Sequence, residues 1–144
     1  MEIQIIEGSH GGLQVTIKCE KVNEEVLSLK SHINRFRGKL TAKRDHEKVF
    51  VELSEVLYFE SVDNRTFLYT SDEVMEIKHR LYELEVMLPP EDFFRISKAQ
   101  IVNINRVKTL APGFNRTLFA TMTNGEQVYI SRKYAVDLRS ALSI

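Results

Sequence analysis

From Lys39 onward the sequence is a succession of short runs in which apolar and polar residues alternate, each ended by residues that favour turns. Such alternation is the pattern of a β-strand with one buried face, because successive side chains point to opposite faces. Asn124-Gly125 marks a tight hairpin between two of these runs. The predicted strands are 39–43, 49–53, 57–62, 66–70, 74–77, 106–110, 117–122 and 127–130, with a strand-like opening to the stretch 93–105.

Two segments of this region have helical spacing instead. Leu81, Leu84 and Leu88 share one helical face, and Pro89-Pro90 ends that helix. The chain closes with a second helix, whose predicted buried stripe is Tyr134, Leu138, Ala141 and Leu142. The predicted fold class is therefore mainly β, and α+β overall.

The sequence pattern of residues 1–37 indicates a separate small unit. Leu13–Cys19 alternates like a half-buried strand, and Asn23 caps a helical run that ends at Gly38. We therefore predict a strand–helix extension over 1–37 and a β domain over 38–144. One strand and one helix cannot close a core, so the extension is expected to pack on the remainder or on another copy of the chain.

The charges are unevenly distributed along a chain whose net charge is zero. From Asp45 to Phe94 there are four basic residues against thirteen acidic ones, a balance of −9. From Arg95 to the end there are eight basic residues against two acidic ones, a balance of +6. A neutral protein can thus carry one basic face, which is the feature that binds phosphate backbones.

Catalytic patterns are absent from the sequence. The four histidines are scattered without metal-ligand spacing, and no glycine-rich loop follows a predicted strand, so we expect neither an enzyme nor a metal or cofactor site. Cys19 is the only cysteine, so no internal disulfide can form, and a reducing compartment is expected. With no apolar run long enough to span a bilayer and no secretory signal at Met1, we predict a cytoplasmic protein.

Two junctions join a strand-like run ending in Ile-Ser to basic residues. Ser97 lies three residues before Gln100, the spacing of a capping box, which predicts a helical turn at Ser97 with Lys98 in its first position. Ser131 is likewise followed by Arg132 and Lys133. Helix amino ends flanked by cations favour phosphate. The alternative is that both serines are ordinary caps and that the cations point into water.

Five segments, in order, resemble the LytTR DNA-binding domain of bacterial response regulators. They are Val56–Ser61, Phe67–Thr70, the Leu81/Leu84/Leu88 helix, Phe94–Asn103 and Val128–Arg132. The resemblance covers roughly 46–144. It implies an elongated, ten-stranded, antiparallel multi-sheet fold that inserts loops into successive major grooves, usually on direct repeats near promoters, and that bends the DNA.

The resemblance also implies where DNA is contacted. The three contacting loops of the family correspond here to Asn64-Arg65-Thr66, to Ser97-Lys98 and to Arg132. Many members have His-Arg or His-Asn in place of Ser97-Lys98, so the bases read there should differ. The usual receiver domain is missing before residue 38, so the chain looks like the stand-alone members, some of which are thought to be restrained by a small membrane-protein partner.

The predicted mechanism distinguishes contacts with DNA phosphates, which position the protein, from contacts with base edges, which recognise the sequence. Phosphates are contacted by Lys98, Arg116, Lys133 and the free amides after Ser97 and Ser131, whereas Arg65, Lys98 and Arg132 reach base edges. The expected function is therefore sequence-specific binding of double-stranded DNA to regulate transcription, without a small-molecule substrate, and residues 1–37 serve as a homodimer contact or a partner-docking segment. The alternative is a protein-interaction module that uses the basic rim and exposed strand edges.

Overall fold

The computed structural model describes residues 1–9, 11–37 and 39–144, and it divides into an amino-terminal unit, Met1–Arg37, and a main unit, Gly38–Ile144. The amino-terminal unit contains α1 (Glu24–Arg37). Asn23 caps this helix as predicted: its Oδ1 accepts a hydrogen bond from the Val26 amide at 3.0 Å, and its carbonyl accepts one from Leu27 at 3.1 Å. The predicted end of the helix at Gly38 lies outside the described residues.

The predicted strand over residues 13–19 is wrong. These residues have no regular secondary structure, and Leu13 and Val15 are 85% and 59% exposed. An alternating run becomes a strand only when its backbone pairs with another strand, and none of the described strands pairs with this one. The amino-terminal unit is therefore one helix preceded by an irregular segment rich in exposed apolar side chains.

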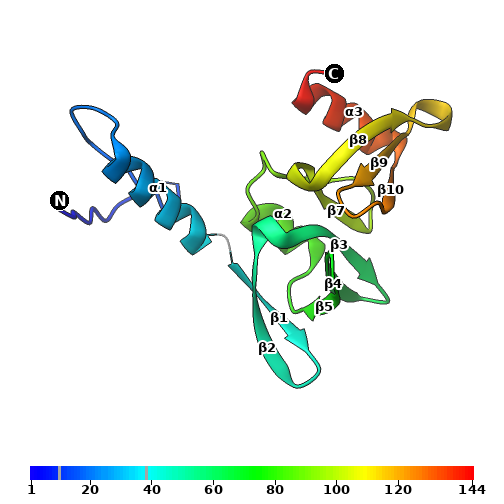
Figure 1. The fold of residues 1–144 in the computed structure, drawn as a ribbon, viewed down its shortest axis with the longest axis horizontal. Helices are drawn as coiled ribbons and strands as arrows, with labels where there is room; N and C mark the ends of the chain where they lie inside the picture. The colour runs from blue at the N-terminus through cyan, green and yellow to red at the C-terminus, as the bar shows by residue number, and fades with distance from the viewer. Residues whose placement is uncertain (10, 38) are drawn as a thin grey trace. The chain divides into compact units, whose positions relative to one another are not determined.

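The described part of the main unit contains ten strands in two antiparallel sheets (Figure 1). The seven-stranded sheet has the order β2-β1-β5-β4-β3-β7-β6, and the three-stranded sheet has the order β10-β9-β8. Their bounds are β1 (Lys39–Arg44), β2 (Glu47–Glu52), β3 (Val56–Val62), β4 (Arg65–Thr70), β5 (Val74–Ile77), β6 (Phe93–Arg95), β7 (Gln100–Asn103), β8 (Val107–Pro112), β9 (Leu118–Met122) and β10 (Gln127–Ile130).

The mainly β, antiparallel fold class is thus confirmed. The helices of the main unit are α2 (Leu81–Met87) and α3 (Arg132–Leu142), with single turns of 3-10 helix at Leu53–Glu55, Ile104–Arg106 and Phe114–Arg116. None of the helices in the described ranges combines the length and the apolar character that crossing a bilayer requires.

Two apolar cores hold the main unit together. The first is formed by the seven-stranded sheet and α2, with Phe59, Leu68 and Leu84 fully buried. The second joins that sheet to the three-stranded sheet and α3, through residues such as Val102 and Ile130. β3 contributes to both cores: Val56 and Phe59 lie in the first, while Leu57 and Tyr58 lie in the second, where the β3–β4 register shifts.

The closing helix packs on the second core largely as predicted. Leu138 is buried, and Tyr134 and Leu142 pack against the same cluster. The prediction was wrong at Ala141, which is exposed, while Ala135 is the buried alanine. Residues 135 and 138 are three apart, so they lie on one face of the helix, and the stripe is rotated by part of a turn from the predicted one.

Candidate nucleic-acid interface

The β3–β4 turn and the β6–β7 loop leave the same end of the seven-stranded sheet. β3 lies between β4 and β7 and runs antiparallel to both. Glu60 pairs with Gln100, and the Ser61 amide donates a hydrogen bond to the Ala99 carbonyl at 2.8 Å. The last residues of β3 therefore lie beside the first residues of β7, and the connections 63–64 and 96–99 are neighbours.

The start of α3 lies beside the β6–β7 loop. The Ser131 amide donates a hydrogen bond to the Ile96 carbonyl at 3.0 Å, and the Ala135 amide donates to the Ser131 carbonyl at 2.8 Å as α3 begins. The three predicted loops thus lie along one end of the main unit, on the right of the view in Figure 1. We call this end the loop rim, defined as residues 63–65, 97–99 and 131–133.

The β3–β4 turn carries Asn64 and Arg65. Asp63 and Asn64 both have positive φ, 51° and 62°, the combination of a tight hairpin turn that matches the twist of its strands. The carbonyl of Asn64 accepts a hydrogen bond from Nη1 of Arg80, so a further cation approaches the rim. Thr66, in contrast, is only 3% exposed. Its side chain is buried within the main unit, so it is not available to contact DNA.

Arg65 is exposed, but its guanidinium is hydrogen-bonded to a carboxylate. Its Nη2 and Nε lie 2.6 and 3.0 Å from the two carboxylate oxygens of Glu76, and its Cζ lies 5.5 Å from the centre of the Phe67 ring. The hydrogen bond and charge of Glu76 raise the pKa of Arg65, and the hydrogen bond from Arg65 lowers the pKa of Glu76. Arg65 can therefore contact DNA only by exchanging this partner or by using its three remaining N–H donors, two on Nη1 and one on Nη2.

The helical turn predicted at Ser97 is wrong. Residues 97–99 form a bend between two paired strands, and the Ser97 hydroxyl accepts a hydrogen bond from the Ala99 amide at 3.1 Å. The Ile96 amide donates to the Gln100 carbonyl at 3.0 Å, which continues the β6–β7 pairing. The side chain of Gln100 donates instead to Glu60 at 2.8 Å, so no capping box forms. Strand pairing overrides the local serine–glutamine signal because it satisfies more backbone groups.

Arg95 stabilises this bend through hydrogen bonds to its backbone. Its guanidinium donates to the carbonyls of Ser97, at 2.7 Å, and Lys98, and it forms an ion pair with Glu85 just after the middle of α2. No sequence pattern singles out Arg95, because two of its three partners are backbone carbonyls and the third, Glu85, is ten residues away. Lys98 is exposed, and no carboxylate within the described residues forms an ion pair with it.

α3 begins at the residue predicted, although without side-chain capping. Ser131 has an extended conformation, and its side chain makes no capping hydrogen bond. Arg132 and Lys133 are exposed; Nζ of Lys133 lies 5.5 Å from the centre of the Tyr134 ring, and neither has an ion pair with a described residue. Free amides of a first helical turn and nearby cations both favour anions, and this helix end has both: its first-turn amides, and two cations without an ion pair among the described residues.

Arg116 lies at the same end of the main unit, in the connection between β8 and β9 of the three-stranded sheet. Leu118 pairs with Ile130, so the connection preceding β9 lies beside the start of α3. Asn115 and Arg116 have φ of 56° and 66°, and the carbonyl of Arg116 accepts a hydrogen bond from Nη1 of Arg139 at 3.3 Å. The side chain of Arg116 is exposed. We treat the connection 113–117 as an extension of the loop rim.

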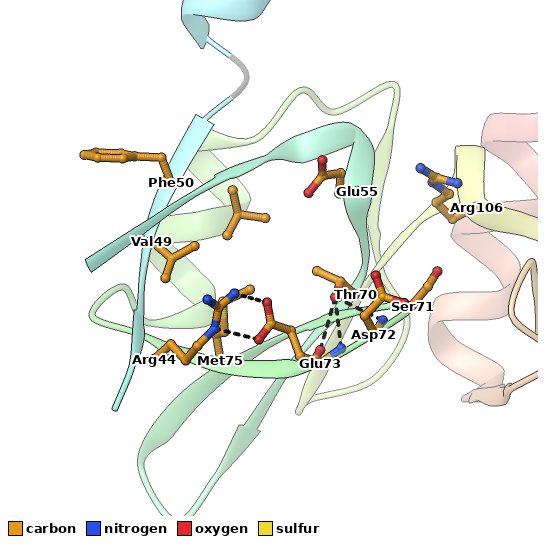
Figure 2. A pocket seen from close by; sticks show the side chains of 11 residues that line it. Arg44, Val49, Phe50, Glu55, Thr70, Ser71, Asp72, Glu73, Met75 and Arg106 are labelled. Carbon is orange, nitrogen blue, oxygen red and sulfur yellow. Dashed lines mark hydrogen bonds and ion pairs between the residues drawn. The ribbon is translucent and has the colours of Figure 1, made fainter. Parts of the chain in front are cut away.

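A pocket of about 360 Å³ lies elsewhere, at the β4–β5 turn and beside β2 (Figure 2). β4 begins at the rim with Arg65 and ends at Thr70, so the pocket is at the opposite end of that strand. The two carboxylate oxygens of Glu73 accept hydrogen bonds from Arg44, and Nε of Arg106 donates a hydrogen bond to the Ser54 carbonyl at 2.6 Å. No group of three metal-ligating side chains occurs among the described residues. The pocket is thus separate from the unpaired cations of the rim.

Comparisons with known proteins agree with this geometry. A family model described as the LytTr DNA-binding domain matches residues 46–143. An uncharacterized HTH-type transcriptional regulator of Staphylococcus aureus is 30% identical over 132 residues, covering 90% of this chain and 89% of that protein. The sensory transduction protein LytT of Bacillus subtilis is 28% identical over 131 residues, which are 91% of this chain and 54% of that protein. The chain therefore spans only about half the length of LytT.

A solved structure has the same fold. It is the LytTr DNA-binding domain of a putative methyl-accepting/DNA response regulator from Bacillus cereus, with a TM-score of 0.72 and 32% sequence identity. The match covers 74% of this chain and 98% of the other.

Proposed function

We propose, from the premise that this chain belongs to the LytTR DNA-binding domain family, that it regulates transcription by binding double-stranded DNA through the loop rim. In this proposal the β6–β7 loop and the start of α3 enter a major groove, and the β3–β4 turn approaches the next one, usually on direct repeats. The observation that supports it most is the pair of hydrogen bonds, Ser61 to Ala99 and Ser131 to Ile96, that unites the three loops. No catalytic activity is part of the proposal.

The exposed cations of the rim have different proposed roles. Arg132 and Lys98 are exposed and without ion pairs among the described residues, so they are proposed to reach base edges, where the planar fork of Arg suits guanine O6 and N7. Lys133, Arg116 and the free amides after Ser131 are proposed to hold phosphates. Arg65 is assigned to base reading only after exchange of Glu76. Asn64 and Ser97 shape their turns and bring the neighbouring side chains to the groove.

The first test is a titration of the protein against a duplex that carries its own promoter region, followed by fluorescence anisotropy at several salt concentrations. With about six phosphates neutralised, the logarithm of affinity should fall with the logarithm of salt concentration at a slope of about −5, because each neutralised phosphate releases counterions. A random duplex of equal length is the control, and it should bind more weakly. A slope near zero on both duplexes would contradict the proposed function.

For the amino-terminal unit we propose self-association into a homodimer. Ile3, Ile5, Ile6, Leu13 and Val15 are all more than half exposed in the described structure. That much exposed apolar surface in one short segment supports the proposal of an interaction site. A small membrane-protein inhibitor is the other candidate partner, and it would leave the free protein monomeric, so sedimentation separates the two.

The protein-interaction alternative for the main unit rests on strand edges. β2 is an outer strand of the seven-stranded sheet, and Phe50 on it is 72% exposed. A partner strand could add to this edge through main-chain hydrogen bonds. This alternative predicts no difference between promoter and random duplexes, whereas the DNA-binding proposal predicts a clear preference.

A further inference from the structure

Phe114 is 92% exposed, more than any other aromatic side chain whose burial the structure describes. It lies in the connection between β8 and β9, in the single 3-10 turn Phe114–Arg116. Phe114 is not part of the second core. A single exposed apolar residue is ordinary on a protein surface, so its meaning depends on how it is held and on what surrounds it.

The connection holds Phe114 in place by a dense set of hydrogen bonds. The Gly113 amide donates to the Thr117 carbonyl at 2.9 Å, and the Thr117 hydroxyl donates to the Phe114 carbonyl at 2.6 Å. Thr117 is 5% exposed, which anchors the loop to the sheet. A Cβ on Gly113 would lie 2.5 Å from the Thr117 hydroxyl oxygen and 2.9 Å from the Phe119 ring, so only glycine fits. These hydrogen bonds therefore hold the backbone of the loop that carries the exposed Phe114 ring.

The surroundings of Phe114 are basic. Arg116 follows it in the same turn, and the pairing of Leu118 with Ile130 brings this turn beside Arg132 and Lys133. The whole stretch from Arg95 to Gly125 contains no acidic residue. An apolar side chain flanked by cations at the edge of a polyanion-binding surface has the composition of the wedges that proteins press against base steps.

We propose that Phe114 is a direct DNA contact: its ring packs on the sugar and base edge of a step next to the one that Arg132 reads. This inference rests on the proposed function and adds an apolar contact to a rim otherwise made of cations and amides. The contact carries no charge, so it should contribute affinity that does not depend on salt. That property distinguishes it from its neighbour Arg116.

The test compares Phe114→Ala with Phe50→Ala and Arg116→Ala in the full chain, by anisotropy on the promoter duplex over a range of salt. Phe50 is a matched control because it is an exposed phenylalanine on β2, at the far edge of the seven-stranded sheet. We expect Phe114→Ala to lower affinity about tenfold, in the range measured for aromatic contacts with bases, with the salt slope unchanged. Phe50→Ala should change neither quantity, and Arg116→Ala should make the slope less steep by about one.

Further variants and outcomes separate this inference from the function it rests on. Phe114→Leu should retain most of the affinity, because leucine also serves as an apolar wedge. If wild-type protein binds with the expected slope but Phe114→Ala binds equally well, the inference alone fails. It also fails if Phe114→Ala lowers the sedimentation coefficient, since the ring would then be a protein–protein contact. If the wild type shows no salt-dependent binding, both proposals fail.

Discussion

The basic residues of the loop rim differ in whether a carboxylate already neutralises them. Arg132 and Lys98 are exposed and make no ion pair with a described residue, whereas Arg65 is held by two hydrogen bonds to Glu76. A guanidinium bound to a protein carboxylate contributes less to attracting DNA than a free one, because the carboxylate repels phosphate. The contribution of each cation therefore depends on its partners as well as on its charge.

Arg132 and Lys133 are adjacent, and they should respond differently to substitution. We expect Arg132→Ala to weaken binding to the promoter site by about 1 to 3 kcal/mol, which is about 5-fold to 150-fold, with a much smaller effect on random duplex. Lys133→Ala should weaken binding to both duplexes alike. Parallel titrations of both variants on both duplexes measure this. Equal losses on the two duplexes from Arg132→Ala would identify Arg132 as a phosphate contact.

Glu76→Gln tests whether Arg65 is available to DNA. The substitution removes a negative charge from the rim and frees the guanidinium, so affinity for both duplexes should rise a few-fold. The side chains are 61% and 33% exposed, and an ion pair at such a surface contributes only about 0 to 1 kcal/mol to folding, so thermal stability should change little. In the double variant Arg65→Ala/Glu76→Gln, most of the gain should disappear. A gain that persists in the double variant would exclude Arg65 as its source.

At the level of elements, Asn103 ties β7 to the segment that precedes β3. Its side chain is 2% exposed, and its Nδ2 donates to the carbonyls of Val56 at 2.8 Å and Leu53 at 3.3 Å. Its Oδ1 accepts from the Asn105 amide at 3.1 Å, at the start of the next 3-10 turn. One buried amide thus satisfies groups from two segments that are about fifty residues apart in the sequence.

Asn103→Ala should lower the free energy of unfolding by about 2 to 4 kcal/mol, because it leaves two carbonyls and one amide of a buried site without this partner. Urea denaturation followed by circular dichroism measures the change. Asn105→Ala is the control: Asn105 donates to Asp92 at 2.9 Å on the surface, and its loss should cost less than about 1 kcal/mol. Equal stability of the two variants would show that the buried amide of Asn103 has no special role.

Two segments differ from their predicted conformations, and both differences arise at the level of elements. Leu13–Cys19 has the alternation of a strand but pairs with none of the described strands, and Ser97 has the spacing of a helix cap but lies between strands that are already paired. In both cases the local pattern was present and the outcome depended on pairing with a distant segment. Asn23 and Ser131, whose helices need only local hydrogen bonds, begin α1 and α3 where predicted.

At the level of the whole molecule, the proposed homodimer depends on the exposed apolar side chains of the amino-terminal unit. The double variant Leu13→Asp/Val15→Asp places two charges where a dimer would bury apolar groups, so it should shift the protein from dimer to monomer in sedimentation velocity. Promoter affinity should fall as well, because two linked domains bind direct repeats with a higher effective concentration. A wild-type protein that is monomeric at all concentrations would contradict the dimer.

The sequence by itself determined most elements of the main unit. Alternation, turn residues and helical spacing act over a few neighbours, so the strands other than β7, the Leu81 helix and the closing helix could be predicted, together with the exposed cations after each serine. β7 was missed because a helical turn was predicted in its place. It also carried the family resemblance, which the match over residues 46–143 confirms.

Only the tertiary structure decided which of these residues meet. β3 pairs with β7 across about forty residues, as between Glu60 and Gln100, and Ser131 reaches Ile96 across thirty-five. These pairings bring the three loops to one end of the main unit. The tertiary structure also gives Arg65 a carboxylate partner on β5, buries Thr66, and leaves Lys98 and Arg132 without an ion pair among the described residues. The physical reason is that local patterns fix the conformation of a segment, whereas its neighbours in space depend on backbone pairing and core packing over the whole chain.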